Sequence, residues 1–203
     1  MFKPRQAAKV RELLPEGLHE AYCYGVVDRG THDRKPYQGK ARPPVQQIQI
    51  MFELTEVKRV FKEENGEEPC VGGIKFNMSF HEQSDLVKIL TPWIGDPEEY
   101  GLENIVGHPA QITIKHNVGN DGKTYDNIES IAPMSPKLIG QMPPRHNKDM
   151  VFDIATHGFD SKEFAGLYPW LQNVIKDSYE YKQASDNAML TEPPMADDSE
   201  IPF

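Results

Sequence analysis

The sequence predicts a mainly β fold in which five strands form a small barrel, followed by a helical C-terminal extension. Strand-like segments with alternating apolar and polar residues recur between Leu18 and Ile131, and turn signals separate them. A single stretch of helical spacing interrupts this series between the third and fourth segments. The expected organisation is an N-terminal arm at 1–17, a β domain at 18–133, a Pro-rich strap and helix at 134–184, and a disordered acidic tail at 185–203.

The five strands are expected in order along the β domain. AYCYGVV (21–27) is rich in aromatic and branched residues, and QIQIMFELTEVKRVF (47–61) alternates apolar with polar side chains. IKFNMSF (74–80) and QITIKHNV (111–118) repeat this alternation, and KTYDNIESI (123–131) follows them. A period of two is typical of strands with one face in the core and the other in solvent.

Turns and one helix complete the domain. Asn65-Gly66 and Asn120-Asp121-Gly122 are hairpin turn signals. EQSDLVKILTPWI (82–94) has helical spacing and a Pro near its end. Three strands, a helix and two strands is the order of a five-stranded OB barrel, with another small β-meander carrying an inserted helix as the alternative.

The C-terminal extension is expected to end in one helix. YPWLQNVIKDSYEYK (168–182) has Pro169 at a first-turn position. Its apolar stripe is Trp170, Leu171, Val174 and Ile175. Such a stripe needs a partner, so the helix is expected to dock on the barrel or on a second copy of the chain as a homodimer.

Composition excludes several classes of protein. The 203 residues have a net charge of −9 and a mean hydropathy of −0.61, without an apolar run long enough for a membrane helix or a secretory signal. Cys23 and Cys70 are expected to be reduced core thiols. No phosphate-binding or dinucleotide-binding motif is present, and no His or Cys spacing fits a metal site. We therefore expect no cofactor, no metal and no enzymatic activity.

A nuclease is the enzyme class for which the sequence offers candidate residues. Glu53, Glu56 and Lys58 could form a carboxylate-lysine set. On one strand, however, Glu53 and Glu56 point to opposite faces. They are expected to be solvated strand charges.

The distribution of charge favours binding of single-stranded nucleic acid. Five acidic residues and no basic one lie between Ser185 and Phe203, whereas residues 29–44 carry five basic residues and the single acid Asp33. We expect 29–44 to be a long loop between strands one and two, and Tyr37 within it offers a plane for a base. In an OB barrel this loop and the one joining strands four and five flank the binding groove. The candidate binding residues are Arg29, Arg34, Lys35, Tyr37, Lys40, Arg42, Tyr22, Tyr24, Lys75, Lys115, Lys123 and Tyr125.

The last residues carry a specific resemblance. MADDSEIPF resembles the C-terminal tip of bacterial single-stranded DNA-binding proteins, through Asp197, Asp198, Glu200, Ile201, Pro202 and Phe203. VVDRGTHDRKPYQGKARPPVQQIQIMFEL resembles the replicative single-stranded DNA-binding proteins of tailed phages.

The resemblance implies a function and a setting. It implies an OB-fold protein that coats single-stranded DNA during phage replication, recombination and repair, in the cytoplasm of an infected bacterium. It also implies that the tail recruits replication and repair proteins and competes with DNA for the groove. An OB-fold adaptor or structural protein that binds protein but no nucleic acid is the alternative.

Overall fold

The computed structural model describes residues 12–191, with side chains as far as residue 187. It divides into two compact units. Among the described residues, unit 1 comprises 12–26 and 49–151, and unit 2 comprises 27–48 and 152–191. The first two strands run from one unit into the other.

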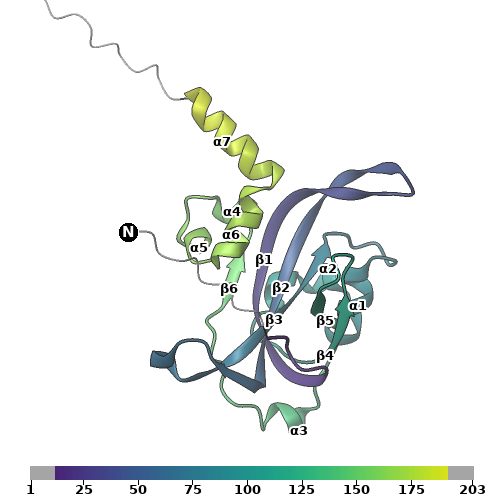
Figure 1. The fold of residues 1–203 in the computed structure, drawn as a ribbon, viewed down its shortest axis with the longest axis vertical. Helices are drawn as coiled ribbons and strands as arrows, with labels where there is room; N and C mark the ends of the chain where they lie inside the picture. Colours follow the sequence, from purple (N-terminus) through teal and green to yellow (C-terminus); the bar gives the residue numbers. More distant parts are fainter. Residues whose placement is uncertain (1–11, 192–203) are drawn as a thin grey trace, which may run out of the picture. The chain divides into compact units, whose positions relative to one another are not determined.

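The described part of the chain is mainly β, as expected, with a curled antiparallel sheet of five strands that forms a half-barrel (Figure 1). The strand order is β3-β2-β1-β4-β5, and the short β6 pairs with β1. Strands β1 and β2 are far longer than expected, at 21 residues each. The strands are β1 Gly17–Tyr37, β2 Lys40–Val60, β3 Glu67–Asn77, β4 Pro109–Val118, β5 Thr124–Ala132 and β6 Met150–Phe152.

A helix lies between β3 and β4, as the sequence predicted. Helix α1 spans Asp85–Ile94, and the Ser84 hydroxyl caps it by accepting a hydrogen bond from Val87 N at 3.2 Å. Pro92 lies inside the helix, which ends before Gly95. Leu86 and Leu90 are buried, and α1 packs on β3 and β5. The short α2 Pro97–Tyr100 and the 3-10 helix Leu102–Ile105 follow, and another 3-10 helix, Glu63–Asn65, lies in the turn between β2 and β3.

The middle of β2, residues 47–55, is buried on both faces, which the sequence did not predict. The apolar residues Ile50, Phe52 and Leu54 are fully buried, but Gln49 and Glu53 on the polar face are also buried. The Glu53 side chain is only 1% exposed, so the expectation of a solvated strand charge is wrong. A carboxylate in such a position needs several hydrogen-bond donors, because burial removes its water.

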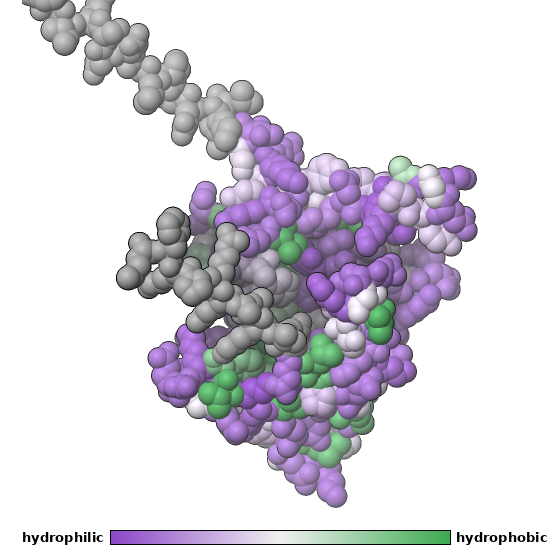
Figure 2. Space-filling view, viewed as in Figure 1, coloured by the Kyte–Doolittle hydropathy of each residue, from purple (hydrophilic) through white to green (hydrophobic). Residues whose placement is uncertain are grey.

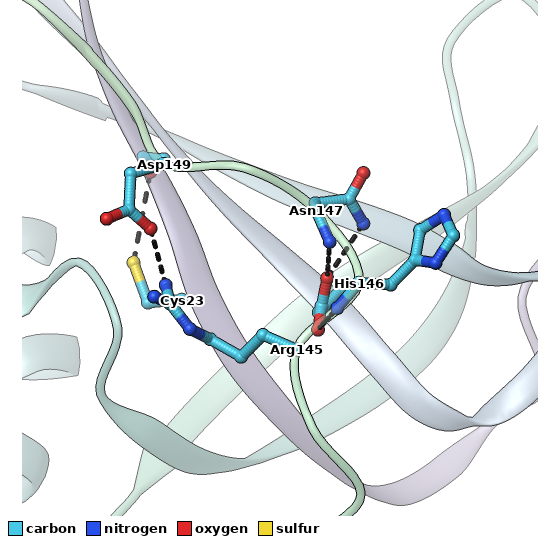
Figure 3. Close-up of polar contacts among 7 residues, drawn as sticks. Cys23, Arg145, His146, Asn147 and Asp149 are labelled. Carbon is cyan, nitrogen blue, oxygen red and sulfur yellow. Dashed lines mark hydrogen bonds and ion pairs between the residues drawn. The ribbon is translucent and has the colours of Figure 1, made fainter.

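The strap supplies those donors. It follows β5, includes α3 Pro136–Ile139, and passes over the polar face of β2 (Figure 3). Glu53 accepts hydrogen bonds from His146 N at 2.9 Å, from Asn147 N at 2.7 Å and from Asn147 Nδ2 at 2.8 Å. The carboxylate therefore fastens the strap to the sheet through two of its backbone amides.

Both cysteines are buried free thiols. Burial raises the pKa of Cys23 to about 12, an effect that the hydrogen bond to Gly25 O and the nearby Arg145 only partly oppose. Burial also raises the pKa of Cys70. Because the thiolate is the reactive form, both side chains serve as small apolar groups in the core.

Unit 2 contains the C-terminal helices. They are α4 Ile154–His157, α5 Lys162–Ala165, α6 Pro169–Lys176 and α7 Tyr179–Thr191. Two helices therefore replace the single one expected, and α7 continues past Ser185 into the segment expected to be disordered. Leu171 and Ile175 are buried as predicted, but Trp170 is 46% exposed and is not part of the buried stripe. Phe152 and Phe164, with ring centroids 5.6 Å apart, complete this small core.

We predict that Glu53→Ala destabilises unit 1. The substitution leaves two strap amides without their acceptor, and lost hydrogen bonds to a charged group cost about 2–3 kcal/mol. The measurement is the free energy of unfolding in urea, compared with Glu56→Ala on the exposed part of the same strand. Equal effects of the two substitutions would contradict the role of Glu53.

Candidate nucleic-acid interface

The basic segment expected to be a loop is a two-stranded ribbon, so that prediction is wrong. Strand β1 continues to Tyr37 and β2 starts at Lys40, which leaves Gln38 and Gly39 as the whole turn (Figure 1). Their φ angles are 49° and 75°, and positive φ at both central residues is typical of a type I′ hairpin turn. We call residues 29–46 the arm. The sequence did not predict these strands for two reasons. Most of the arm is exposed, so its residues do not alternate between apolar and polar. The arm also contains three prolines, which are uncommon within strands.

The turn fixes which side chains share a face of the arm. In a two-residue hairpin Tyr37 and Lys40 lie opposite each other with side chains on one side. Because alternate residues of a strand share a face, Lys35 and Arg42 lie on this side too. We call these four residues the tyrosine face. All four are exposed, Tyr37 at 63%, whereas Arg34 on the other face is partly buried.

The base of the arm is built around Asp28. Its buried carboxylate accepts hydrogen bonds from Gly30 N at 2.8 Å and from Gln46 Nε2 at 3.1 Å. Burial raises the pKa of Asp28, and these hydrogen bonds offset only part of that effect. Arg29 is partly buried at the same place, and burial lowers its pKa. Arg29 is therefore less accessible than the cations of the tyrosine face.

Helix α7 is attached to the base of the arm. Glu180 accepts hydrogen bonds from Thr31 N at 2.8 Å and from Thr31 Oγ1 at 2.6 Å. The approach is close, because a Cβ on Gly30 would lie 2.5 Å from Ser178 Cβ, and Gly30 also has a φ of 79°. Although partial burial acts to raise the pKa of Glu180, the hydrogen bonds from Thr31 outweigh it and lower the pKa. No local sequence pattern could predict this contact, because it joins residues 149 positions apart.

The acid within the basic segment also contacts α7. Asp33 Oδ1 accepts a hydrogen bond from the Tyr179 hydroxyl at 2.7 Å. Asp33 lies on the same side of β1 as Lys35 and Tyr37. The Asp33 carboxylate therefore has a hydrogen-bond donor within unit 2, in addition to the basic residues near it in the sequence.

The other candidate residues belong to unit 1. Tyr24 is fully buried, so the hypothesis that it stacks on a base is wrong. Its strand is covered on both faces there, and the aromatic ring fills the core. Tyr22 is partly buried, and Lys75 is exposed.

The hairpin of β4 and β5, including its turn, carries cations that are paired with acids. Lys115 Nζ lies 2.6 Å from Glu129 Oε2, and Lys123 Nζ lies 3.7 Å from Asp121 Oδ2. Tyr125 is 43% exposed and donates its hydroxyl to Asp121 at 2.7 Å. This turn offers an accessible ring but a weaker positive potential than the tyrosine face.

The remaining expectations fall on other parts of the chain. The six tail residues, Asp197 to Phe203 without Ser199, lie outside the described residues. Of the set considered for a nuclease, Glu53 is buried under the strap while Glu56 and Lys58 are exposed. Within 12–191 no group of three or more His, Cys, Asp or Glu side chains is placed to hold a metal ion.

Exposed apolar side chains are scattered over the surface. On the face shown in Figure 2, hydrophilic residues predominate and apolar residues form small separate groups among the coloured atoms. None of the helices between residues 12 and 191 is long and apolar enough to cross a membrane.

Comparisons with known proteins yield no match. No family model, curated protein or solved structure matches this chain.

We predict that the contact between Glu180 and Thr31 is lost in acid. A carboxyl pKa lowered in the folded state contributes stability above its unfolded value, 4.5 here, and loses it as pH falls through the folded value. Amide hydrogen exchange at Thr31 should show full protection at pH 7 and falling protection below about pH 4.5. In Glu180→Ala, which removes both acceptor oxygens, the protection should be low at both pH values, while the β4–β5 amides stay unchanged. If neither acid nor the substitution changed the exchange protection of the Thr31 amide, the contact would be contradicted.

Proposed function

We propose that this protein binds single-stranded DNA without sequence preference, and that the arm is its principal contact. The observation that carries the proposal is the tyrosine face. Lys35, Lys40 and Arg42 share one face of the arm with the exposed ring of Tyr37, in a chain whose net charge is −9. Such a concentration of cations runs against the charge of the whole chain and therefore needs a specific ligand.

The chemistry of the tyrosine face suits a single strand rather than a duplex. Cations neutralise phosphates, and an exposed aromatic ring stacks on a base that is not paired. Stacking tolerates every base, because each has a π face. The expected outcome is coating of single strands in replication, recombination and repair.

The strand order supports the assignment of unit 1 to the OB fold. In the order β3-β2-β1-β4-β5 the first three strands form a meander, and the helix lies between the third and fourth. This is the connectivity of an OB barrel, in which β1 and β2 are joined by one of the nucleic-acid-binding loops. We propose that the arm is a long, structured version of that loop.

The tail completes the proposal. Its acids resemble a phosphate backbone in charge, and Ile201 and Phe203 can enter an apolar pocket of a replication or repair protein. We propose that the tail recruits such partners and competes with DNA for basic groups of the chain, as the resemblance to phage and bacterial proteins implies. The setting is then the cytoplasm of an infected bacterium.

The arm is tested by salt dependence. In the double variant Lys40→Ala/Arg42→Ala, affinity for oligo-dT should fall, and the slope of log K against log salt should flatten by about 0.7 for each lost phosphate contact. The matched control Lys88→Ala/Lys137→Ala removes the same charge from exposed positions in α1 and α3. Equal slopes for the two double variants would place the binding site elsewhere.

No binding by the wild type at low salt would favour the protein-binding adaptor, and magnesium-dependent cleavage would favour a nuclease.

The tail is tested by two variants that should diverge. Deleting Asp197 to Phe203 changes the net charge from −9 to −6 and should raise affinity for oligo-dT, most at low salt, because the competition is electrostatic. Removing Phe203 alone keeps the acids, so DNA affinity should hardly change while capture of replication proteins falls. Unchanged DNA affinity after the full deletion would refute the competition, and intact capture without Phe203 would refute the recruitment.

A further inference from the structure

We propose that Tyr179, the first residue of α7, is a second stacking site for an unpaired base, in line with Tyr37 on the arm. The inference rests on the proposed binding of single-stranded DNA and names a residue that the sequence did not point to. The ligand is an unpaired nucleobase of the same strand that contacts the tyrosine face.

The exposure of Tyr179 is the first observation. Half of the side chain is accessible, with 50% of its surface exposed, although the residue begins a helix docked on the arm. The hydroxyl is held by Asp33 Oδ1 at 2.7 Å, and the neighbouring Glu180 is held by Thr31. The ring is therefore anchored at its polar end while much of its apolar surface stays in water. A stacking platform needs such an oriented and accessible ring.

The position of Asp33 is the second observation. Asp33, Lys35 and Tyr37 alternate along one strand, so they lie on one side of it. At about 3.3 Å per residue, Asp33 and Tyr37 are about 13 Å apart. A stacked single strand advances about 3.4 Å per nucleotide, so the two rings fall within a few nucleotides of each other. Lys35 lies between them on β1, where it can pair with the intervening phosphate.

The electrostatics of this end of the arm are the third observation. The acids Asp33 and Glu180 keep their negative charge, because hydrogen bonds from neutral donors do not neutralise a carboxylate. Lys35 lies on the same side of β1 as Asp33 and offsets the charge of that acid. Asp33 accepts a hydrogen bond from the Tyr179 hydroxyl, and Glu180 accepts two from Thr31. The hydrogen bond to Asp33 also raises the pKa of Tyr179, so its hydroxyl remains a donor at neutral pH. The contact thus positions the ring of Tyr179 beside β1.

Four variants test the inference by oligo-dT affinity. Tyr37→Ala and Tyr179→Ala should each weaken binding about 5- to 150-fold, the range that loss of one base-stacking aromatic produces. Tyr179→Phe keeps the ring and loses only the hydroxyl, so its affinity should stay within about threefold of the wild type. The matched control is Tyr100→Ala, because Tyr100 is 36% exposed and hydrogen-bonded to His108 but lies among the acids of α2.

The outcomes separate this inference from the proposed function. A wild type that does not bind oligo-dT overturns DNA binding itself. If Tyr37→Ala weakens binding while Tyr179→Ala matches Tyr100→Ala, DNA binding stands and the second site is overturned. Equal losses in Tyr179→Phe and Tyr179→Ala would show that only the hydrogen bond matters, which also overturns stacking.

A crosslinking experiment on the wild type covers the case in which Tyr179→Ala fails to fold. Oligo-dT with 5-iodouracil at single positions is bound and irradiated, and the crosslinked residues are found by mass spectrometry. Crosslinks to both Tyr37 and Tyr179, from positions a few nucleotides apart, are expected. Crosslinks to Tyr37 without any to Tyr179 would overturn the inference.

Discussion

The hydrogen bonds between Glu180 and Thr31 are the constraint on which unit 2 depends. They join the start of α7 to β1 across 149 positions of sequence, and the lack of a side chain at Gly30 allows Ser178 to approach. A two-stranded ribbon has little stability by itself, because it buries almost no apolar surface. The helix therefore gives the exposed arm a firm base, and it brings Tyr179 to the side that carries Tyr37.

In unit 1, Glu53 likewise holds a distant segment, the strap, against a strand. The polar face of β2 is covered by a strap that has few apolar residues of its own, so burial alone would hold it weakly. A buried carboxylate with three donors replaces apolar contact with hydrogen bonds to a charged acceptor, which are stronger than neutral ones. The acids of this chain therefore have different roles. Glu53 and Glu180 hold segments together, whereas those of the tail remain available for partners in the proposed function.

The arm shows how one element can combine rigidity with accessibility. Its backbone groups pair across the ribbon, which leaves its side chains for a ligand. Lys40 and Arg42 on one strand and Lys35 on the other place positive charge on the face of the arm that carries Tyr37. A flexible loop with the same residues would lose more conformational entropy on binding. A preformed ribbon is thus well suited to the binding without sequence preference that we propose.

The sequence by itself determined the strands with one apolar face, the two hairpin turns in unit 1 and the helix between β3 and β4, because these follow from periodicity and turn chemistry. It also determined that basic residues are concentrated around Tyr37 in the segment 29–44. Only the tertiary structure decided that 29–44 is a ribbon, that Tyr24 and Glu53 are buried, and that Tyr179 lies beside the arm. Local pattern reports which faces are apolar, but burial of a polar face depends on a distant segment that covers it. For Glu53 that segment is the strap, and for Thr31 and Asp33 it is α7, each a contact between residues far apart in the sequence.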